Sequence, residues 1–375
     1  MDDAIYADES IYEYPMQQGG GNDGRPYSFG RPSSGGSKAA YPCKSYGQGR
    51  INPAYFYGVF DPNDMRRDVS ITMTGSNGKG VEKLIPFVPN SKAEGGGLTL
   101  NKWDENRQAN PWVAAQRKSG INGPYMRMSE VYLGYAEVCA ALGDVVTGKQ
   151  YLKTVRERSF PQGLANTDAF IASFGNDLVR AIIEERGFEY AGEGDRRWTL
   201  IRSGYLPEDI KRIKDMTKAM MDGLATKGYY EFENGNIISA YIWTKLVDAK
   251  TIYGHRLTAQ CPTDKVNDPV LYPGWRGQKD NWEGMGLNYG SSTPATNLAI
   301  KGLFEIVSEE EAASLESQGY TKVNWGIDLV DNRDEYDKYL FWDYDYVSAP
   351  IYLWPFTPNV MAAGGFTNGY GFKQE

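Results

Sequence analysis

The residues whose types and spacing could support chemistry form one stretch, IIEERGFEYAGEGDRRW, at residues 182–198. A glycosidase needs two carboxylates flanking the scissile bond, about 5 Å apart in a retaining enzyme. Glu184, Glu185, Glu193 and Asp195 supply carboxylates here, but arginines alternate with them. Opposite charges three or four residues apart usually pair along a helix. We therefore interpret the stretch as an ion-pair network that fixes helix ends, with an acid/base pair as the alternative.

Other catalytic signatures are weak. The chain has one histidine, so a Ser/His/Asp triad would have to use His255, and neither GxSxG nor HExxH occurs. The segment YGHRL around it is more typical of a structural or surface histidine. Residues 75–80, GSNGKG, lack the GxxxxGK[ST] spacing of a phosphate loop because Gly80 and Val81 follow Lys79. We expect a hairpin turn there.

Metal and cofactor signals are equally sparse. Cys43, Cys139 and Cys261 lie far apart without a CxxC pair, so a zinc site is unsupported, and Cys139 is expected to be a buried thiol. Residues 263–268 and 331–335 are rich in oxygen ligands but lack EF-hand spacing, so solvated loops are favoured over calcium sites. We expect no cofactor, and the sequence leaves metal binding undetermined.

The composition narrows the class of protein. The chain has 375 residues, a formal net charge of −8 and no dense cluster of Lys and Arg, so it is not expected to bind nucleic acid. No run of 18 apolar residues predicts a transmembrane helix. The 27 Tyr, 14 Phe and 9 Trp among 43 Gly indicate rings carried on ordered loops or packed beneath them.

Helical periodicity marks the elements that must position these residues. Residues 124–160 predict a helical hairpin with tetratricopeptide-like spacing, which must stack on other helices because one such unit cannot bury its apolar face alone. Residues 176–204 predict a helix, a charged turn and a shorter helix, and residues 207–224 predict another. The side chains expected to be buried are Val131, Tyr135, Leu152, Ile182 and Ile183.

Few strands are expected. Residues 10–15 favour a short strand and residues 52–57 a short helix, while residues 69–74 and 81–88 favour a hairpin closed at residues 76–78. The fold class is therefore mainly α, a tetratricopeptide-like helical scaffold with long loop-rich insertions and minor β structure. Three regions are expected to share one fold: a loop-rich segment with the hairpin at 1–120, a helical core at 121–228, and a loop-rich closing segment at 229–375.

Four motifs occur in the order found in one known family. They are DPNDMRR at 61–67, MRMSEVYLGYAE at 126–137, IEERGFEYAGEGDRRW at 183–198, and LWPFTP with NGY between 353 and 370. Together they resemble the C-terminal portion of SusD/RagB-family outer-membrane nutrient-binding lipoproteins of Bacteroidetes-type bacteria. The final motif departs from the family pattern by lacking its Gln and second Pro. The polar start MDDAIYADES is not a secretory signal, so we expect the family's lipoprotein signal and first helices to be missing.

The resemblance implies a non-catalytic cell-surface receptor at the outer membrane. Such a receptor captures oligosaccharides and passes them to a SusC-like TonB-dependent transporter, and it touches the membrane only through a lipid anchor that this chain lacks. An oligopeptide receptor on the same scaffold is one alternative. A glycoside hydrolase that uses the clustered carboxylates is another.

Ligand residues cannot be carried over by motif, because the family binds ligands on variable loops. Aromatic faces pack on the C–H faces of sugar rings, so we look for rings in polar, Gly-rich loops. The first candidates are Trp275, Trp282 and Tyr289 in PGWRGQKDNWEGMGLNY, followed by Trp103, Trp112 and Tyr57. Packing in the protein core is the alternative for each ring.

Overall fold

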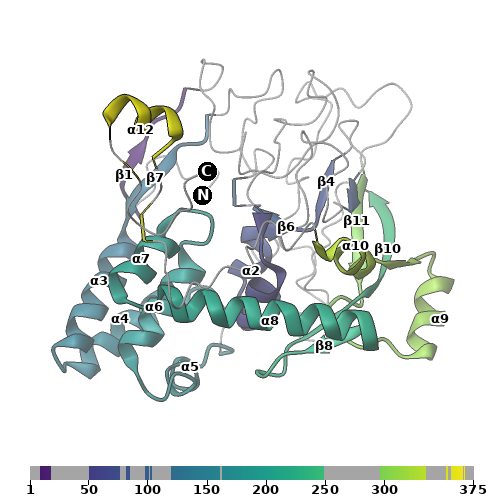
Figure 1. Ribbon diagram of the computed structural model, residues 1–375. Coiled ribbons are helices and arrows are strands. Elements are labelled where there is room, and N and C mark those ends of the chain that lie inside the picture. The colour runs from purple at the N-terminus through teal and green to yellow at the C-terminus, as the bar shows by residue number, and fades with distance from the viewer. Residues whose placement is uncertain are drawn as a thin grey trace.

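Helices form the body of the molecule, and short strands lie around it (Figure 1). The structure is a computed structural model that describes residues 9–17, 50–76, 82–84, 98–100, 102–103, 120–160, 163–248, 296–334, 352–353, 356–365 and 367. The arrangement confirms the expected fold class, a mainly α, tetratricopeptide-like scaffold with minor β structure.

The expected helical hairpin consists of α3 (Met128–Ala141) and α4 (Val145–Glu157). Gly143 makes the turn with φ 88°, a backbone conformation that glycine adopts without strain. The Asp144 carboxylate then caps α4 by accepting a hydrogen bond from Thr147 N at 3.1 Å. Helix α6 (Leu178–Glu189) packs against both helices, and α5 (Thr167–Ala172) joins α4 to α6.

The first hydrophobic core lies between these helices. Leu152, Ile182 and Ile183 are buried as predicted, and Cys139 is a buried free thiol. The side chains of this core are Leu133, Ala136, Leu152, Val155, Ile171, Leu178, Ala181, Ile182 and Tyr190. Because α6 is buried along almost its whole length, its charged residues are carried into the interior with it.

The prediction that Val131 and Tyr135 are buried was wrong. Val131 is 41% exposed and Tyr135 49% exposed. They lie on one face of α3, whereas Leu133 and Ala136 lie on the face that packs against α4 and α6. Since α3 carries apolar residues on both faces, periodicity alone did not distinguish the buried face from the exposed one.

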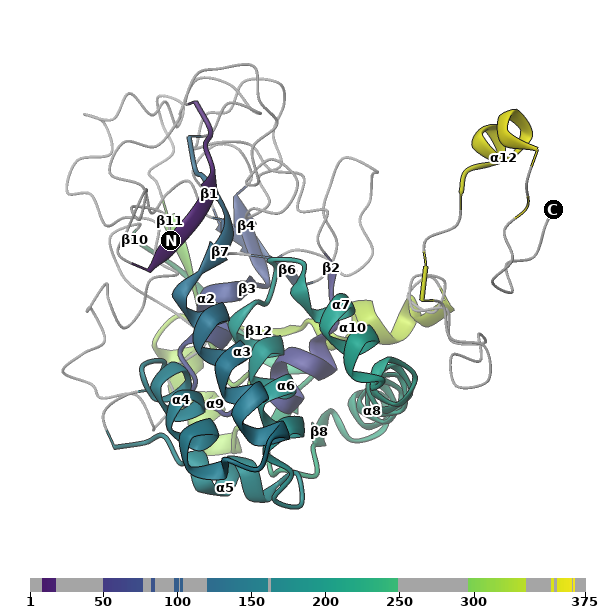
Figure 2. The ribbon, with the colours of Figure 1, turned by 90° about the vertical axis from the view of Figure 1, so that its left-hand side faces the viewer.

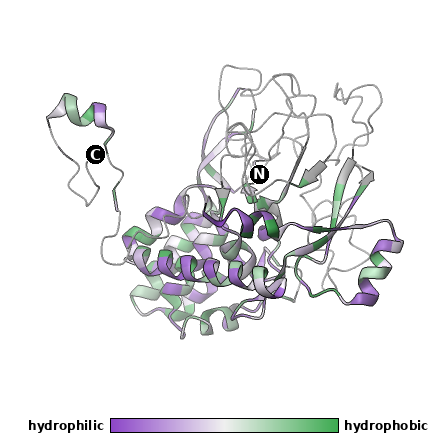
Figure 3. Ribbon diagram, turned by 45° about the vertical axis from the view of Figure 1, so that its right-hand side comes forward, coloured by the Kyte–Doolittle hydropathy of each residue, from purple (hydrophilic) through white to green (hydrophobic). Residues whose placement is uncertain are grey.

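Helices α7 (Asp195–Ser203) and α8 (Leu206–Lys227) follow the charged turn, as predicted. Gly194, with φ 94°, precedes α7, and Gly204, with φ 79°, separates the two helices. The long helix α8 crosses the lower half of the molecule in Figure 1, from α7 toward β8. In Figure 3, hydrophilic and hydrophobic residues interleave along the helices, as expected for elements with one buried side.

A second core forms between α8 and the strands. It is organised around η1 (Ala54–Val59), a short π-helical turn that coincides with the helix expected at residues 52–57. Phe60 stacks on Phe56 with ring centroids 5.0 Å apart and contacts Phe188 of α6 at 4.4 Å. This core therefore joins α6 to η1 and α8. Further members are Tyr57, Met220, Met221, Leu224, Ile238, Ile242 and Trp325.

The strands are short and mostly antiparallel pairs. The ribbon of β1 (Ser10–Tyr14) and β7 (Gly123–Arg127) includes the strand expected near residue 10. The remaining sheets are β2 (Arg50–Ile51)–β6 (Leu98–Leu100)–β3 (Ile71–Thr72), β4 (Thr74–Ser76)–β5 (Glu82–Leu84), β8 (Tyr229–Glu231)–β9 (Ile237–Ser239), and β11 (Thr296–Lys301)–β10 (Tyr241–Asp248)–β12 (Thr321–Asn324).

The hairpin expected from residues 69–88 forms between β4 and β5. Its first strand begins later than predicted, because Val69 and Ser70 belong to α2 (Arg66–Ser70), and Ile71 and Thr72 form β3, which pairs with β6. The last two residues of the DPNDMRR motif, Arg66 and Arg67, begin α2, and α2 contacts α6.

The last helices are α9 (Glu309–Ser317), α10 (Gly326–Asp331) and α12 (Pro358–Gly364). Ser308 and Glu311 form a reciprocal capping box at the start of α9. In Figure 2, α12 stands apart from the helical body. Across the described ranges, no helix is both long and apolar enough to cross a membrane.

Candidate functional site

The sequence motifs converge on Glu189, the last residue of α6. Its carboxylate accepts hydrogen bonds from Arg66 Nη1 at 2.9 Å, from Arg158 Nη2 at 2.6 Å and from Arg127 Nη1. Its backbone carbonyl accepts two more, from Lys102 Nζ at 2.8 Å and Arg127 Nη2 at 2.9 Å. Four basic side chains therefore hold this helix end, where the carbonyls of an α-helix lack partners within the helix.

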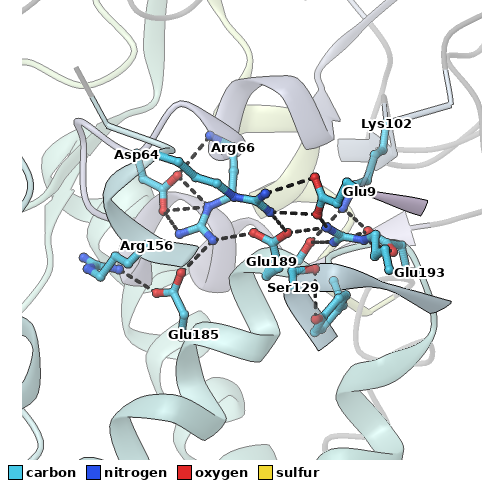
Figure 4. Close-up of polar contacts among 12 residues, drawn as sticks. Glu9, Asp64, Arg66, Lys102, Ser129, Arg156, Glu185, Glu189 and Glu193 are labelled. Atoms are coloured by element: carbon cyan, nitrogen blue, oxygen red, sulfur yellow. Dashed lines mark hydrogen bonds and ion pairs between the residues drawn. The ribbon is translucent and has the colours of Figure 1, made fainter. Parts of the chain in front are cut away.

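Arg66 connects the DPNDMRR motif to α6 (Figure 4). Its guanidinium donates to Asp64 Oδ2 at 2.6 Å, to Glu185 Oε1 at 2.7 Å and to Glu189. The other oxygen of Glu185 accepts from Arg156 Nη1 at 2.9 Å. The planar fork of arginine suits this bridging role. Two neighbouring turns of α6 are thus tied to α2 and to the end of α4.

Arg127 makes the corresponding connection to strands β1 and β7. It donates to Glu193 Oε2 at 3.0 Å and to Glu9 Oε1 at 2.8 Å, and its guanidinium lies 4.7 Å from the centroid of the Tyr190 ring. Lys102 Nζ pairs with the same Glu193 carboxylate. Glu9 also accepts from Arg158 Nη1 at 3.0 Å.

The charges of this cluster balance. We call it the Glu189 network; its cations are Arg66, Lys102, Arg127, Arg156 and Arg158, and its anions are Glu9, Asp64, Glu185, Glu189 and Glu193. Burial favours the neutral form of Glu189, but Arg127, Arg66 and Arg158 outweigh it and hold the pKa of this carboxyl well below its ordinary value of 4.5. Glu189 is therefore ionised at neutral pH.

A second network fixes the other side of α6. Arg196 Nη2 donates to Glu184 Oε2 at 2.8 Å and to Asp209 Oδ2 at 2.7 Å. Asp209 also accepts from Arg212 at 2.8 Å and from Arg180 at 3.1 Å. Although burial opposes ionisation, Arg196 and Arg212 lower the pKa of Asp209 below its ordinary value. This network joins α6, α7 and α8.

The motif carboxylates are therefore engaged in structural pairing, which confirms the predicted ion-pair network. The pairs that Glu184 and Glu185 form join different elements, however, and not residues three or four apart along one helix. A general acid needs a raised pKa and access to substrate. Glu189 and Asp209 have lowered pKa values, and Glu184 and Glu185 are buried against arginines. The arrangement therefore shows two sets of ion pairs that fix the buried helix α6 in place.

No group of three or more His, Cys, Asp or Glu side chains suited to a metal ion occurs in the described part of the chain. The loop expected at residues 331–335 begins instead inside α10, which ends at Asp331. There, Asn332 Nδ2 donates to the Asp328 carbonyl at 2.9 Å, and Arg333 pairs with Asp222 at 2.6 Å. The other loop, residues 263–268, lies outside the described residues, as does His255.

The candidate ligand residues fall into two groups. Tyr57 and Trp103 are fully buried. Tyr57 packs edge-on to Phe304 with ring centroids 5.1 Å apart, and Trp103 Nε1 donates to the Gly192 carbonyl at 3.5 Å. These contacts match the packing alternative for both rings. The other candidates lie outside the described residues; they are Trp112, Trp275, Trp282 and Tyr289.

Sequence reasoning assigned no ligand role to three exposed tyrosines on the β1–β7 ribbon: Tyr12, Tyr14 and Tyr125. The signal was present in SIYEY, where aromatic residues two positions apart lie on a short strand. Roles for Asp64 and Lys102 in the Glu189 network were also missed. For Arg66, the family motif implied a role in holding helices together, but no local spacing indicates its partners, since Arg66 and Glu185 are 119 residues apart.

Residues 5–355 match the SusD family. The chain belongs to this family. Three of its family motifs, at residues 61–67, 126–137 and 183–198, contribute side chains to the Glu189 network and so hold the scaffold together. Of the final motif, Leu353 is described and half-exposed, whereas residues 354–355 lie outside the described part.

Individual relatives match part of the chain. SusD-like protein P25 of Formosa agariphila is 28% identical over 160 residues, which cover 42% of this chain and 26% of the relative. A SusD homologue from Bacteroides thetaiotaomicron is 19% identical, covering 57% of this chain and 44% of its own, with a TM-score of 0.42. Surface glycan-binding protein A of the same species, in complex with laminarihexaose, is 18% identical, covering 56% and 47%, with a TM-score of 0.36.

Proposed function

We propose that this chain acts as a non-catalytic cell-surface receptor for oligosaccharides. Its membership of the SusD family, over residues 5–355, carries the proposal. The chemistry of the described residues is consistent with it. The buried carboxylates Glu184, Glu185 and Glu189 are paired with arginines, so the clustered charges stabilise a scaffold and leave ligand binding to exposed side chains.

The receptor would deliver its ligand to a SusC-like TonB-dependent transporter at the outer membrane, to which a lipid anchor would attach it. Both features follow from the family resemblance. Co-purification of the receptor with a SusC-like transporter from the same organism tests the pairing. Separate elution of the two proteins from membranes solubilised in mild detergent would contradict it.

Isothermal titration calorimetry tests glycan binding. Laminarihexaose is the first probe, alongside hexasaccharides of cellulose, amylose, mannan and xylan. We expect saturable binding to at least one of them. Binding confined to an oligopeptide mixture, with no heat from any glycan, would replace the proposal by the peptide-receptor alternative.

Turnover is tested on the same ligands. We expect purified protein to release no reducing sugar from a bound glycan. Steady product formation that is abolished by a single Glu→Gln or Asp→Asn substitution would establish the hydrolase alternative.

A further inference from the structure

The β1–β7 ribbon is anchored at both ends. At its base, Met128 N donates to the Glu9 carbonyl at 2.8 Å, and the Glu9 carboxylate joins the Glu189 network. At the other end, the Asn122 side chain donates to Glu13 Oε2 at 2.7 Å and accepts from Met16 N at 2.9 Å. These bonds hold a two-stranded ribbon that is only marginally stable in isolation.

Between these anchors the ribbon exposes three aromatic rings. Tyr12 is 56% exposed, Tyr14 65% and Tyr125 76%. Tyr12 and Tyr125 come from opposite strands and meet edge to face, with centroids 5.6 Å apart and planes at 84°. Tyr14 lies two residues beyond Tyr12, roughly 7 Å along the strand, opposite Gly123. Figures 1 and 2 both show β1 beside β7, rising from the helical body.

Exposed tyrosines on a fixed backbone suit recognition of a sugar. A tyrosine ring offers a rigid apolar face with a hydroxyl at its edge. Because the side chain has few rotatable bonds, it loses little conformational entropy when a ligand binds to it. The faces can stack on the C–H faces of pyranose rings, while the phenol hydroxyls can exchange hydrogen bonds with sugar hydroxyls. Aromatic stacking platforms on short strands bind extended nucleic-acid chains in the same general way.

We propose that Tyr12, Tyr14 and Tyr125 form a binding platform for a neutral oligosaccharide. This proposal rests on the proposed glycan-receptor function and assigns it a site. The net charge of −8 disfavours a polyanionic ligand, so the platform is assigned to a short uncharged glycan.

Alanine variants of the three tyrosines test the platform by calorimetry on the neutral glycan of the hexasaccharide panel that binds most tightly. Each single change should weaken binding about fivefold, the equivalent of one stacked ring. The triple variant should lose measurable binding. Tyr12→Phe keeps the ring and should stay within about twofold of wild type. Trp198→Ala, at a ring 53% exposed on α7, is the matched control and should bind as wild type does.

Hydrogen exchange supplies a readout that does not depend on variants. Adding the same glycan to wild-type protein should slow exchange at residues 10–14 and 123–127 and leave α9 unchanged. Triple-variant binding at wild-type strength, or no change in exchange on the ribbon, would overturn the platform while leaving the receptor function intact. No binding of any panel glycan by wild type would overturn both. Tighter binding of an oligouronate would overturn the neutral-ligand assignment.

Discussion

Gly187 lies directly against the side chain of Tyr55. A Cβ at position 187 would overlap the Tyr55 hydroxyl and stand 2.6 Å from Arg196 Nη1. The glycine of the IEERGFE motif therefore leaves space for two side chains that cross α6. Arg196 cannot withdraw freely, because it is paired with both Glu184 and Asp209.

Gly187→Ala should therefore destabilise the fold by about 1–3 kcal/mol, as overpacking of a buried site does. Urea unfolding followed by circular dichroism measures this change. Gly134→Ala is the matched control, since Gly134 also lies within a helix but a Cβ there meets nothing within 4 Å. It should be neutral or stabilising by up to about 1 kcal/mol. Equal effects of the two changes would contradict the close approach.

Tyr55→Phe should partly rescue Gly187→Ala. The Tyr55 hydroxyl has no hydrogen-bond partner among the described residues, so its removal alone should cost little. In the double variant, one of the two overlaps disappears. In a double-mutant cycle, the double variant should have a higher free energy of unfolding than the sum of the two single effects predicts. Additive effects would mean that Gly187→Ala destabilises the fold for a reason other than the overlap with the Tyr55 hydroxyl.

Glu189→Gln should cost about 3–5 kcal/mol of stability. The change keeps the side chain's shape but leaves the largely buried Arg66 and Arg127, and the half-exposed Arg158, without a shared anion. Chemical denaturation compares it with Glu316→Gln on the exposed face of α9, which should change stability by less than about 0.5 kcal/mol. A loss of the same small size at Glu189 would mean that the network contributes little.

The Glu189 network also predicts a dependence of stability on pH. Since the folded-state pKa of Glu189 lies below its ordinary value of 4.5, its contribution is fully present above that value. It is lost as pH falls toward the folded-state pKa. Stability of the wild type should decline below about pH 4.5, by up to about 1.4 kcal/mol per pH unit from this group. The decline should be shallower in Glu189→Gln, and parallel curves would refute the assignment.

Ile182→Asp should be severely destabilising, by about 4 kcal/mol or more, because it places an unpaired charge in the first core. Val131→Asp introduces the same charge on the exposed face of α3 and should have a small effect. Differential scanning calorimetry of the two variants compares their melting temperatures and so distinguishes the buried site on α6 from the exposed face of α3. A comparable loss in both would restore the buried position first expected for Val131.

The loop tryptophans remain a separate prediction. Trp275→Ala and Trp282→Ala should each weaken glycan binding by about 1 kcal/mol or less, at the low end of base–aromatic stacking, with little loss of stability. Unchanged calorimetric affinity in the double variant would remove the loop from the binding surface. This measurement is independent of the ribbon variants, so the two surfaces can be ranked.

Periodicity predicted helices well wherever one face alone is apolar. Residues 207–224 show such a stripe, and α8 forms there with Met220 and Leu224 buried. Helix α3 was harder, because Val131 and Leu133 are equally apolar and only the position of α4 and α6 decides which is covered. That position is a property of tertiary packing, so it cannot be read from the local sequence.

The charged motif shows the same limit. Its alternation of Glu and Arg predicted ion pairs three or four residues apart, but Arg186 pairs instead with Asp195, nine residues away on α7, at 2.6 Å. Glu185 and Glu189 pair with Arg66 and Arg127, which lie on remote segments of the chain. Spacing along a helix predicts ion pairs between residues up to four positions apart. It does not predict pairs with segments that are distant in the sequence. The exposed tyrosines were missed for a related reason, since exposure depends on what the rest of the fold leaves uncovered.

The sequence separation within the Glu189 network has a consequence for the order of folding. Arg66 reaches Glu185 and Glu189 across 119 and 123 residues, whereas α3, α4 and α6 contact one another over short distances along the chain. Contacts that close long loops form late, because their entropic cost must be met first. We therefore expect the helical core to assemble early with its two glutamates still hydrated, and the arrival of residues 64–66 to complete the native state in a slower step.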